Sequence, residues 1–564
     1  MSKPFRSALL LLSGAALAAC GKPPSSIDPP LAYAPADTPY AFANLSPPSP
    51  AMIDWYSHQM QAIWPPAIGV YEGLIDNAAS LDARDQKLIR ALLDELRDHG
   101  SYEKLRELGY KPDAHFAIYG VGLVPVLRME LSDPAAFKAT IARIESKAGE
   151  KIATGKTGDQ DYWQFSGKSV TIAVAVQGAQ LVATLWAADT SDAARQLLLG
   201  LKKPDKNLLD AGTLQAIAKK YNYSPYGDGY VDFAALAKRL SSAATGADLE
   251  IAKAMQLPTG PAIDNPVCVA ETQALAQKFP RLVIGGESMT PPHFKVAAQL
   301  EIEPTLAQAL MAAFTAAPGT GAPAEGLIDI SVATPLLKLK SFWLKQADAV
   351  AAKPFACPEL AGLNDAFAKA RERLGATIPP PFSDLTGMRV TIDKLDPRKD
   401  TPIPDIAARA LIGSNNPLAM IGMAQMAVPQ LKDWQIKADG KPVALPDGLV
   451  PASVKLPPIS IAMTDKAIGL AAGESEEAAL TAYFTATPGA TPVFLRMHFS
   501  GAVYGLLGKY ANAMQSRMSA DKKDQLAQQT QLFSLYEKMI RSGEFTFEFN
   551  PNGFGLRETV ELGD

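Results

Sequence analysis

A strand that runs into a proline-containing helix start recurs along this sequence, and this feature constrains the fold more than any other. The pattern begins at Val126 (VLRMELSDPAAFKATIARI), at Val296 (VAAQLEIEPTLAQALMAAF) and at Ala408 (ARALIGSNNPLAMIGMAQM). In each copy the proline falls near the first helical turn, where its missing N–H costs little. The recurrence predicts strands that alternate with helices over most of the chain.

A second module, a strand that leads directly into a helix, begins at Gly229, at Leu327 and at Phe494. The outer parts of the chain share further features. Trp163 and Trp434 each begin a Trp-Gln-apolar stretch, which is followed by a predicted hairpin and a capped helix. These shared features indicate an old internal duplication.

Together the modules predict an α+β fold, in which duplicated strand-helix modules form mainly antiparallel sheets packed by helices. We expect the duplication to cover roughly 115–303 and 408–562. The predicted domains are a first α+β repeat domain with N-terminal helices over 40–303, a shortened middle unit over 304–407 and a second repeat domain over 408–564.

The N-terminus has the pattern of a secretory signal. Lys3 and Arg6 give it a basic start, and an apolar run follows from Ala8 to Leu17. The run is shorter than the about 20 apolar residues that span a bilayer, and proline-rich sequence follows it. These features predict a signal peptide over residues 1–19.

The apolar run ends in Leu17-Ala18-Ala19-Cys20, which resembles the lipobox of bacterial lipoproteins. The resemblance implies cleavage before Cys20, a diacylglycerol on its sulfur and an acyl chain such as palmitate on the new α-amine, which together anchor a chain to a membrane. The alternative is an ordinary signal peptide that is cut after an alanine.

The residues after Cys20 bear on where the chain would be anchored. Gly21 stands where the inner-membrane retention signal of that family has an aspartate. The resemblance therefore implies, in a Gram-negative host, a lipid anchor in the outer membrane that faces the periplasm. Residues 20–39 are rich in proline and serine, so we expect them to form an extended tether.

Two further cysteines, Cys268 and Cys357, lie in the body of the chain. The expected compartment is oxidising, so the pair is expected to form a disulfide. Such a bond would close a loop of roughly 90 residues, which in the loop-entropy model is worth about 4 to 5 kcal/mol. The alternative is two buried, unpaired thiols.

The formal net charge of −4 and the absence of a Lys/Arg run argue against nucleic acid as a partner. No motif in the chain has the spacing of a catalytic, cofactor or metal site. His58, His99, His115, His293 and His498 match no ligand pattern. Gly155-Lys156-Thr157 and Gly167-Lys168-Ser169 lack the earlier glycine of a phosphate-binding loop.

Three short motifs of penicillin-binding enzymes occur in the chain, at Lys156-Thr157-Gly158, Ser414-Asn415-Asn416 and Ser519-Ala520-Asp521-Lys522. They stand in the reverse of that family's order. No catalytic residue is therefore predicted, and an enzyme is the less favoured interpretation.

Two stretches could bind a partner. Met420, Met423 and Met426 recur at a spacing of three, and methionine surfaces adapt to varied apolar partners. The loop from Tyr221 to Tyr230 gathers tyrosines among glycine and proline, a composition that binds sugars or proteins. A packed helix and a packed connection are the favoured interpretations of these two stretches.

The repeated strand-helix pattern resembles uncharacterised envelope proteins with repeated α/β modules, and this resemblance carries no functional residues. The leading hypothesis is a non-enzymatic outer-membrane lipoprotein that binds a protein, lipid or glycan partner in cell-envelope assembly or maintenance. The alternatives are a periplasmic carrier of an apolar ligand and an envelope hydrolase with a non-contiguous site. No cofactor is predicted.

Overall fold

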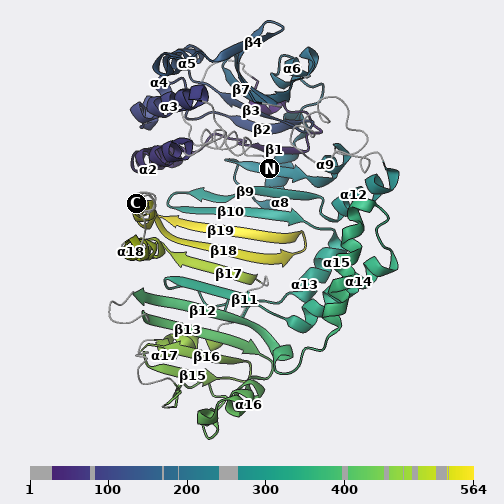
Figure 1. Cartoon of the computed structure of the whole chain (residues 1–564), viewed down its shortest axis with the longest axis vertical. Helices are drawn as coiled ribbons and strands as arrows, with labels where there is room; N and C mark the ends of the chain where they lie inside the picture. Colours follow the sequence, from purple (N-terminus) through teal and green to yellow (C-terminus); the bar gives the residue numbers. More distant parts are fainter. Residues whose placement is uncertain are drawn as a thin grey trace. The chain divides into compact units, whose positions relative to one another are not determined.

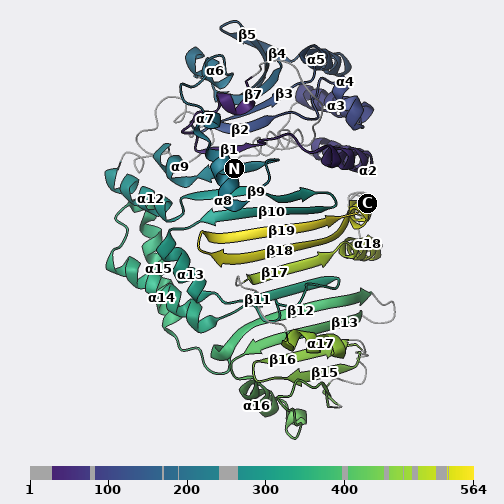
Figure 2. The same cartoon turned by 180° about the vertical axis from the view of Figure 1, so that it is seen from behind.

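The computed structural model describes residues 28–76, 83–167, 170–188, 190–239, 265–396, 404–446, 448–449, 457–473, 476–485, 493–515, 530 and 532–563. Cys20 and the whole predicted signal peptide lie outside these residues. The chain divides into unit 1, Met1–Val296, and unit 2, Ala297–Asp564. Figures 1 and 2 show the strands and helices of both units from opposite sides.

Unit 1 begins with the 3-10 helix η1 (Pro30–Tyr33) and continues with strands and helices in alternation. Its strands are β1 (Tyr40–Ala43), β2 (Phe116–Val121), β3 (Val124–Glu130), β4 (Ala153–Thr157), β5 (Gln160–Ser166), β6 (Val170–Gln177), β7 (Gln180–Ala187), β8 (Asp228–Asp232) and β9 (Arg281–Thr290). Its helices are α2 (Pro50–Asp76), α3 (Ala83–Asp98), α4 (Tyr102–Glu107), α5 (Pro134–Ala148), α6 (Asp192–Leu198), α7 (Leu208–Ala211), α8 (Thr213–Tyr221), α9 (Phe233–Arg239) and α12 (Pro266–Lys278). Strand β10 (His293–Glu301) crosses the boundary between the units.

Unit 2 repeats this alternation. Its strands are β11 (Ile328–Ala333), β12 (Leu385–Asp396), β13 (Asp405–Ser414), β14 (Val443–Ala444), β15 (Ile459–Met463), β16 (Ala467–Ala472), β17 (Val493–Ser500), β18 (Ile540–Asn550) and β19 (Gly553–Leu562). Its helices are α13 (Pro304–Ala313), α14 (Leu336–Ala352), η2 (Pro358–Leu360), α15 (Ala361–Gly375), η3 (Phe382–Asp384), α16 (Pro417–Ala427), η4 (Pro429–Leu431), α17 (Glu476–Thr485) and α18 (Ala502–Gln515). Residues 304–407, expected as a middle unit, contribute β11 and β12 to this sheet.

The strands of the two units pair in the same order. In unit 1 the order is β6-β7-β3-β2-β1-β8-β9. In unit 2 it is β15-β16-β13-β12-β11-β17-β18. All of these pairs are antiparallel, so the predicted α+β class with antiparallel sheets and packed helices is confirmed.

Local sequence signals explain why several elements begin and end where they do. Asp133 accepts hydrogen bonds from the first turn of α5, and Asn416 does the same for α16, each with proline as the next residue. This is the favoured chemistry of a helix N-terminus. Asn550 pairs with Gly553 across the two-residue loop Pro551-Asn552, so the hairpin between β18 and β19 forms next to an Asn-Gly pair, a sequence common in tight hairpins.

The proline-rich stretch that was expected to be a tether up to Pro39 is partly folded. Leu31 and Ala34 are buried. The Ala36 N–H donates to Lys206 O at 2.9 Å, and the Leu208 N–H donates to Ala34 O at 2.8 Å. From η1 onward this stretch therefore belongs to the body of unit 1.

Candidate binding face

In strand β12 the polar side chains are buried and the apolar ones are exposed, which is the reverse of an ordinary half-buried strand. Its polar residues Arg389 and Thr391 are 0% exposed, whereas Met388 is 46% and Val390 37% exposed. Antiparallel sheets with one solvated face usually turn apolar residues inward and polar residues outward. In the neighbouring strand β11, Asp329 is likewise fully buried, while Ile330 is 41% exposed. One sheet face is therefore polar and covered, and the opposite face is apolar and open.

The polar face is stable because its charges bind each other and nearby backbone. Arg389 Nε donates to Asp329 Oδ1 at 3.0 Å, and Arg389 Nη2 forms an ion pair with the same carboxylate. Arg389 also donates to the carbonyl oxygens of Gly319 and Pro323, and its guanidinium lies 3.8 Å from the centre of the Tyr483 ring in α17. A buried charge needs such pairing, because desolvation would otherwise cost several kcal/mol.

Arg409, on β13, is held in the same way. Its Nη1 donates to Glu476 Oε2 at 2.6 Å, and it also forms ion pairs with Asp393 and Glu325. Burial opposes its charge, but the hydrogen bond to Glu476 and the nearby carboxylate of Asp393 outweigh burial, so the pKa of Arg409 is raised. This guanidinium therefore stays charged and has a structural role.

Arg496, on β17, is less completely bonded. Its Nη1 donates to the carbonyl oxygens of Thr320 and Ala322, at 3.1 and 3.0 Å. Its Nε and Nη2, and the hydroxyl of Ser331, have no hydrogen-bond partner among the described residues. Burial, followed by the charge of Arg389, lowers the pKa of Arg496.

The apolar face is built from residues that neighbour each other across the strands. Ile330 pairs with Val390 on one side and with Met497 on the other. Met388 pairs with Val332 and with Ile412. We call the set Ile330, Val332, Met388, Val390, Ile412 and Met497 the apolar face of unit 2. Ile330, Met388 and Val390 are exposed and the other three are half-buried, and a contiguous set of such apolar side chains marks an interaction site.

Helices border the apolar face of unit 2. Ile421 of α16 packs on Met463 and Ile468 of β15 and β16, and α13 contacts β18 and β19. Tyr483 of α17 packs with Leu411 on the polar face. In Figure 2 α17 lies in front of β13 and β16, whereas in Figure 1 it lies behind them and strands β11, β12 and β17 are seen without a helix in front.

Unit 1 has the same arrangement in milder form. Arg128 is fully buried, donates to Gln180 and to the Leu199 carbonyl at 2.7 and 2.8 Å, and lies 3.6 Å from the Tyr33 ring centre. On the opposite face of the sheet, Leu282 and Ile284 of β9 are exposed. Both units therefore cover a polar face and leave apolar side chains open on the other.

The buried charges fall in corresponding rows of the two sheets. When the capping residues Asp133 of α5 and Asn416 of α16 are aligned, Arg128 corresponds to Leu411. The residues that pair with these two across the neighbouring strands then define one row in each unit. The cross-strand row runs Arg128, Ala117, Ala43, Asp228 in unit 1 and Leu411, Arg389, Ser331, Arg496 in unit 2. Each row thus has one well-bonded arginine and one under-bonded charged residue.

Asp228 is the under-bonded residue of unit 1. It is fully buried, and neither of its carboxylate oxygens has a hydrogen-bond partner among the described residues. Burial raises the pKa of the Asp228 carboxyl to about 7. The hydroxyl of Ser224, in the tyrosine-rich loop before β8, is also without such a partner there.

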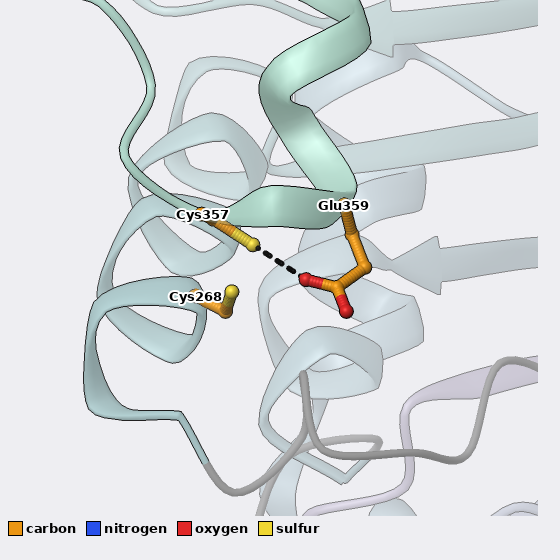
Figure 3. Close-up of side chains that lie close together, drawn as sticks. All are labelled: Cys268, Cys357 and Glu359. Carbon is orange, nitrogen blue, oxygen red and sulfur yellow. Dashed lines mark hydrogen bonds between the residues drawn. The ribbon is translucent and has the colours of Figure 1, made fainter.

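Cys268 and Cys357 are disulfide-bonded, as the sequence predicts. Figure 3 shows the two cysteines side by side, with the Glu359 carboxylate next to the Cys357 sulfur. Cys357 Sγ lies 3.2 Å from Glu359 Oε2. A bonded sulfur offers no thiolate, so the oxidised pair provides no metal ligands even though the three groups lie within 4.8 Å of one another.

The penicillin-binding motifs fall in different parts of the chain. Lys156 and Thr157 lie on β4 in unit 1, and Ser414 is buried at the end of β13 in unit 2. Ser519 to Lys522 lie outside the described residues. The histidines have ordinary contacts: His115 Nδ1, for example, lies 3.4 Å from Glu130 Oε1. Although burial opposes ionisation, hydrogen bonds with His115 and Lys111 lower the pKa of Glu130 to about 2.

The methionine helix is only half packed. Met420 joins the cluster around Ile421, but Met423 and Met426 are exposed. The open apolar face and the arginine network were not predicted from the sequence. The available signal was the alternation in Met388-Arg389-Val390-Thr391, which predicts a strand but does not say which of its faces is covered.

The chain matches no family model, and a search of the curated proteins gives no match. Among solved structures, it shows similarity to one described as "Structure of crystal form I of TP0453", with 11% identity and a TM-score of 0.22 over 49% of this chain and 79% of that chain. Among the described residues, no helix has both the length and the apolarity to cross a bilayer.

Proposed function

We propose that this chain is a lipid-anchored envelope protein, not an enzyme, that binds apolar chains such as those of lipids on the open faces of its sheets. The observation that carries the proposal is the reversed alternation of β11 and β12, with Ile330, Met388 and Val390 exposed beside fully buried Asp329 and Arg389. Full burial of an exposed side chain of this kind is worth about 1.5 to 3 kcal/mol, and each of these three forgoes the part that corresponds to its exposed area. A bound acyl chain would recover part of that free energy.

The chemistry of this face favours an apolar ligand over a charged one. The six side chains that define it are all uncharged, and the guanidinium groups of Arg389 and Arg409 are bonded on the opposite side of the sheet. Polar groups that could orient a sugar ring are absent from the six residues of the face. An apolar ligand matches this composition because binding it removes apolar area from water without desolvating a charge.

The proposed address rests on the lipobox resemblance at Cys20. Anchoring through diacylglycerol would keep the apolar faces close to a membrane, which is a source of acyl chains. Labelling cells with a palmitate analogue tests this part of the proposal. The chain should incorporate the label, and Cys20→Ala should abolish incorporation; an unlabelled wild-type chain would refute the anchor.

Lipid binding is tested with the purified full chain and a fluorescent fatty acid. Ile330→Lys and Val390→Lys should each weaken binding by at least tenfold, equivalent to about 1.4 kcal/mol. Leu337→Lys is the matched control, because Leu337 is exposed on α14 of the same unit but lies outside the apolar face. Equal binding by all variants, or no binding by the wild type, would contradict the proposed function.

We also propose that the two units descend from one duplicated module. Supporting observations are the shared strand order, the Asp133-Pro134 and Asn416-Pro417 helix starts, and the packing of Trp163 and Trp434 beside α5 and α16. The corresponding elements begin at β1 and β11. The repeats would then be longer than the stretches 115–303 and 408–562.

A further inference from the structure

Helix α16 is apolar on the side that faces solvent. Its sequence, PLAMIGMAQMA from Pro417 to Ala427, contains no charged residue. Leu418 is 66% and Met426 81% exposed, and Met423 is also exposed. A helix that is apolar on all sides is normally buried on all sides. Ile421 accounts for the buried side, and the outer side needs another explanation.

Helix α5 of unit 1 shows what the outer side of such a helix can do. It follows β3 as α16 follows β13, and both helices start with a capping side chain followed by proline. When the two prolines are aligned, Met423 corresponds to Thr140, Met426 to Arg143 and Ala427 to Ile144.

Helix α3 covers Arg143 and Ile144 of α5, whereas Thr140 contacts the carbonyl oxygen of Leu108, which follows α4. Ile144 packs in one cluster with Leu88 and Ala91 of α3. Arg143 Nε donates to Glu95 Oε2 of α3 at 3.1 Å. Thr140 is buried. The outer side of α5 is therefore the surface on which an amphipathic helix packs, and we call such a surface a helix seat.

Among the described residues of unit 2, the corresponding seat on α16 is exposed. The helices between its first two strands, α14 and α15, pack against each other, and α14 also contacts α13. Met423, Met426 and Ala427 remain exposed. We propose that the outer side of α16 binds an amphipathic helix of a partner protein, seated as α3 is seated on α5.

The residues of α16 specify the chemistry of that partner helix. Arg143 of α5 pairs with an acid, but Met426 stands at the corresponding position of α16. The partner helix should therefore carry an apolar residue where α3 has Glu95, and apolar residues on the same face at helical spacing. Methionine suits such a seat because its flexible side chain adapts to the partner surface.

The test uses α3 itself as the template for the probe. The probe is an acetylated, fluorescent peptide of residues 83–98 that carries Glu95→Leu, and its binding to the full chain is followed by fluorescence anisotropy. We expect saturable binding to the wild-type chain that weakens at least tenfold in the Met426→Arg variant. Met426 is 81% exposed, so this substitution should leave folding intact. Leu337→Arg, an exposed site on α14, is the matched control and should bind as the wild type does.

A charge exchange sharpens the test. The unmodified α3 peptide, which keeps Glu95, should bind the Met426→Arg variant more tightly than it binds the wild type, because the Arg143–Glu95 pairing would be rebuilt. Absence of saturable binding by either peptide, or equal binding to Met426→Arg and Leu337→Arg, would overturn the proposal. So would Met426-dependent binding to phosphatidylcholine vesicles without peptide binding, since it would assign the seat to a membrane. This proposal is tested separately from acyl binding on the sheet, because the outer side of α16 contains none of the six residues of the apolar face.

Discussion

The rows of buried charges differ between the two units. In unit 1 the well-bonded residue is Arg128 on β3, and the residue with unsatisfied polar atoms is the acid Asp228 on β8. In unit 2 the well-bonded residue is Arg389 on β12, and the residue with unsatisfied polar atoms is another arginine, Arg496 on β17. Arg128 is held by neutral acceptors and a tyrosine ring, whereas Arg389 is held by a buried carboxylate. One architecture thus buries charge with two different bonding patterns. The buried polar face is therefore a feature of the fold, whereas the residues that bind each buried charge differ between the units.

The largest expected effect comes from removing the two arginines in turn. Arg389→Met leaves the Asp329 carboxylate buried without its cation, which should destabilise unit 2 by about 3 to 5 kcal/mol. Arg128→Met leaves only neutral acceptors unsatisfied and should cost unit 1 about 1 to 3 kcal/mol. Hydrogen exchange in urea, read separately on peptides of each unit, measures both losses. The double variant Asp329→Asn, Arg389→Met should recover part of the loss; equal losses in the two single variants would break the comparison.

Substitutions at the covered seat between α3 and α5 and on the exposed side of α16 should differ almost as much in their effect on the free energy of unfolding. Leu88→Ala removes a buried side chain between α3 and α5 and should cost about 2 to 5 kcal/mol. Leu418→Ala, on the exposed side of α16, should change the free energy of unfolding by less than about 0.5 kcal/mol. Thermal unfolding of the two variants provides the measurement. A large loss in Leu418→Ala would mean that the outer side of α16 is covered within the folded chain.

The acid of unit 1 should make its stability depend on pH. The Asp228 carboxyl has its pKa raised to about 7 in the folded chain, against about 3.9 in an unfolded one. Between these values the folded state holds more protons, so this group lowers stability as pH rises from about 4 to 7. Asp228→Asn should therefore stabilise unit 1 by about 1 to 3 kcal/mol at pH 8 and leave it unchanged below pH 4. At the corresponding position of unit 2, Arg496→Met should show no such pH dependence between pH 4 and 8; a pH-independent effect of Asp228→Asn would remove this contrast.

The smallest expected effect is at the apolar face itself. Ile330→Thr replaces a partly exposed β-branched side chain by a shorter, polar β-branched one, so it should change the stability of unit 2 by less than about 0.5 kcal/mol. Urea unfolding followed by circular dichroism measures this change. A loss of 2 kcal/mol or more would show that Ile330 is buried in the folded chain and would weaken the proposed ligand site.

Signals that act within a few residues were predictable from the sequence. The proline-containing helix starts at Pro134 and Pro417 and the Cys268–Cys357 pair need only local chemistry or an oxidising compartment, and the structure has all three. The antiparallel α+β class followed from the same modules.

The candidate site was not predictable, because it depends on which sheet face is covered. Period-two alternation in β12 fits a strand whichever face is buried. The cover is supplied by Tyr483 of α17 and by the Gly319 and Pro323 carbonyls, which are distant from Arg389 in sequence. The methionine helix posed the same difficulty, since a single sequence does not reveal which side of α16 lacks a neighbour.

The folded start of unit 1 limits how far the protein could work from its proposed anchor. Because η1 is already packed into the body, the tether that would link a lipid on Cys20 to the folded chain ends near Asp28 rather than at Pro39. Fully stretched, that tether reaches about 25 to 30 Å. A protein that gives or receives the ligand would therefore have to come to the bilayer surface, because the anchored chain could not carry the ligand across the compartment.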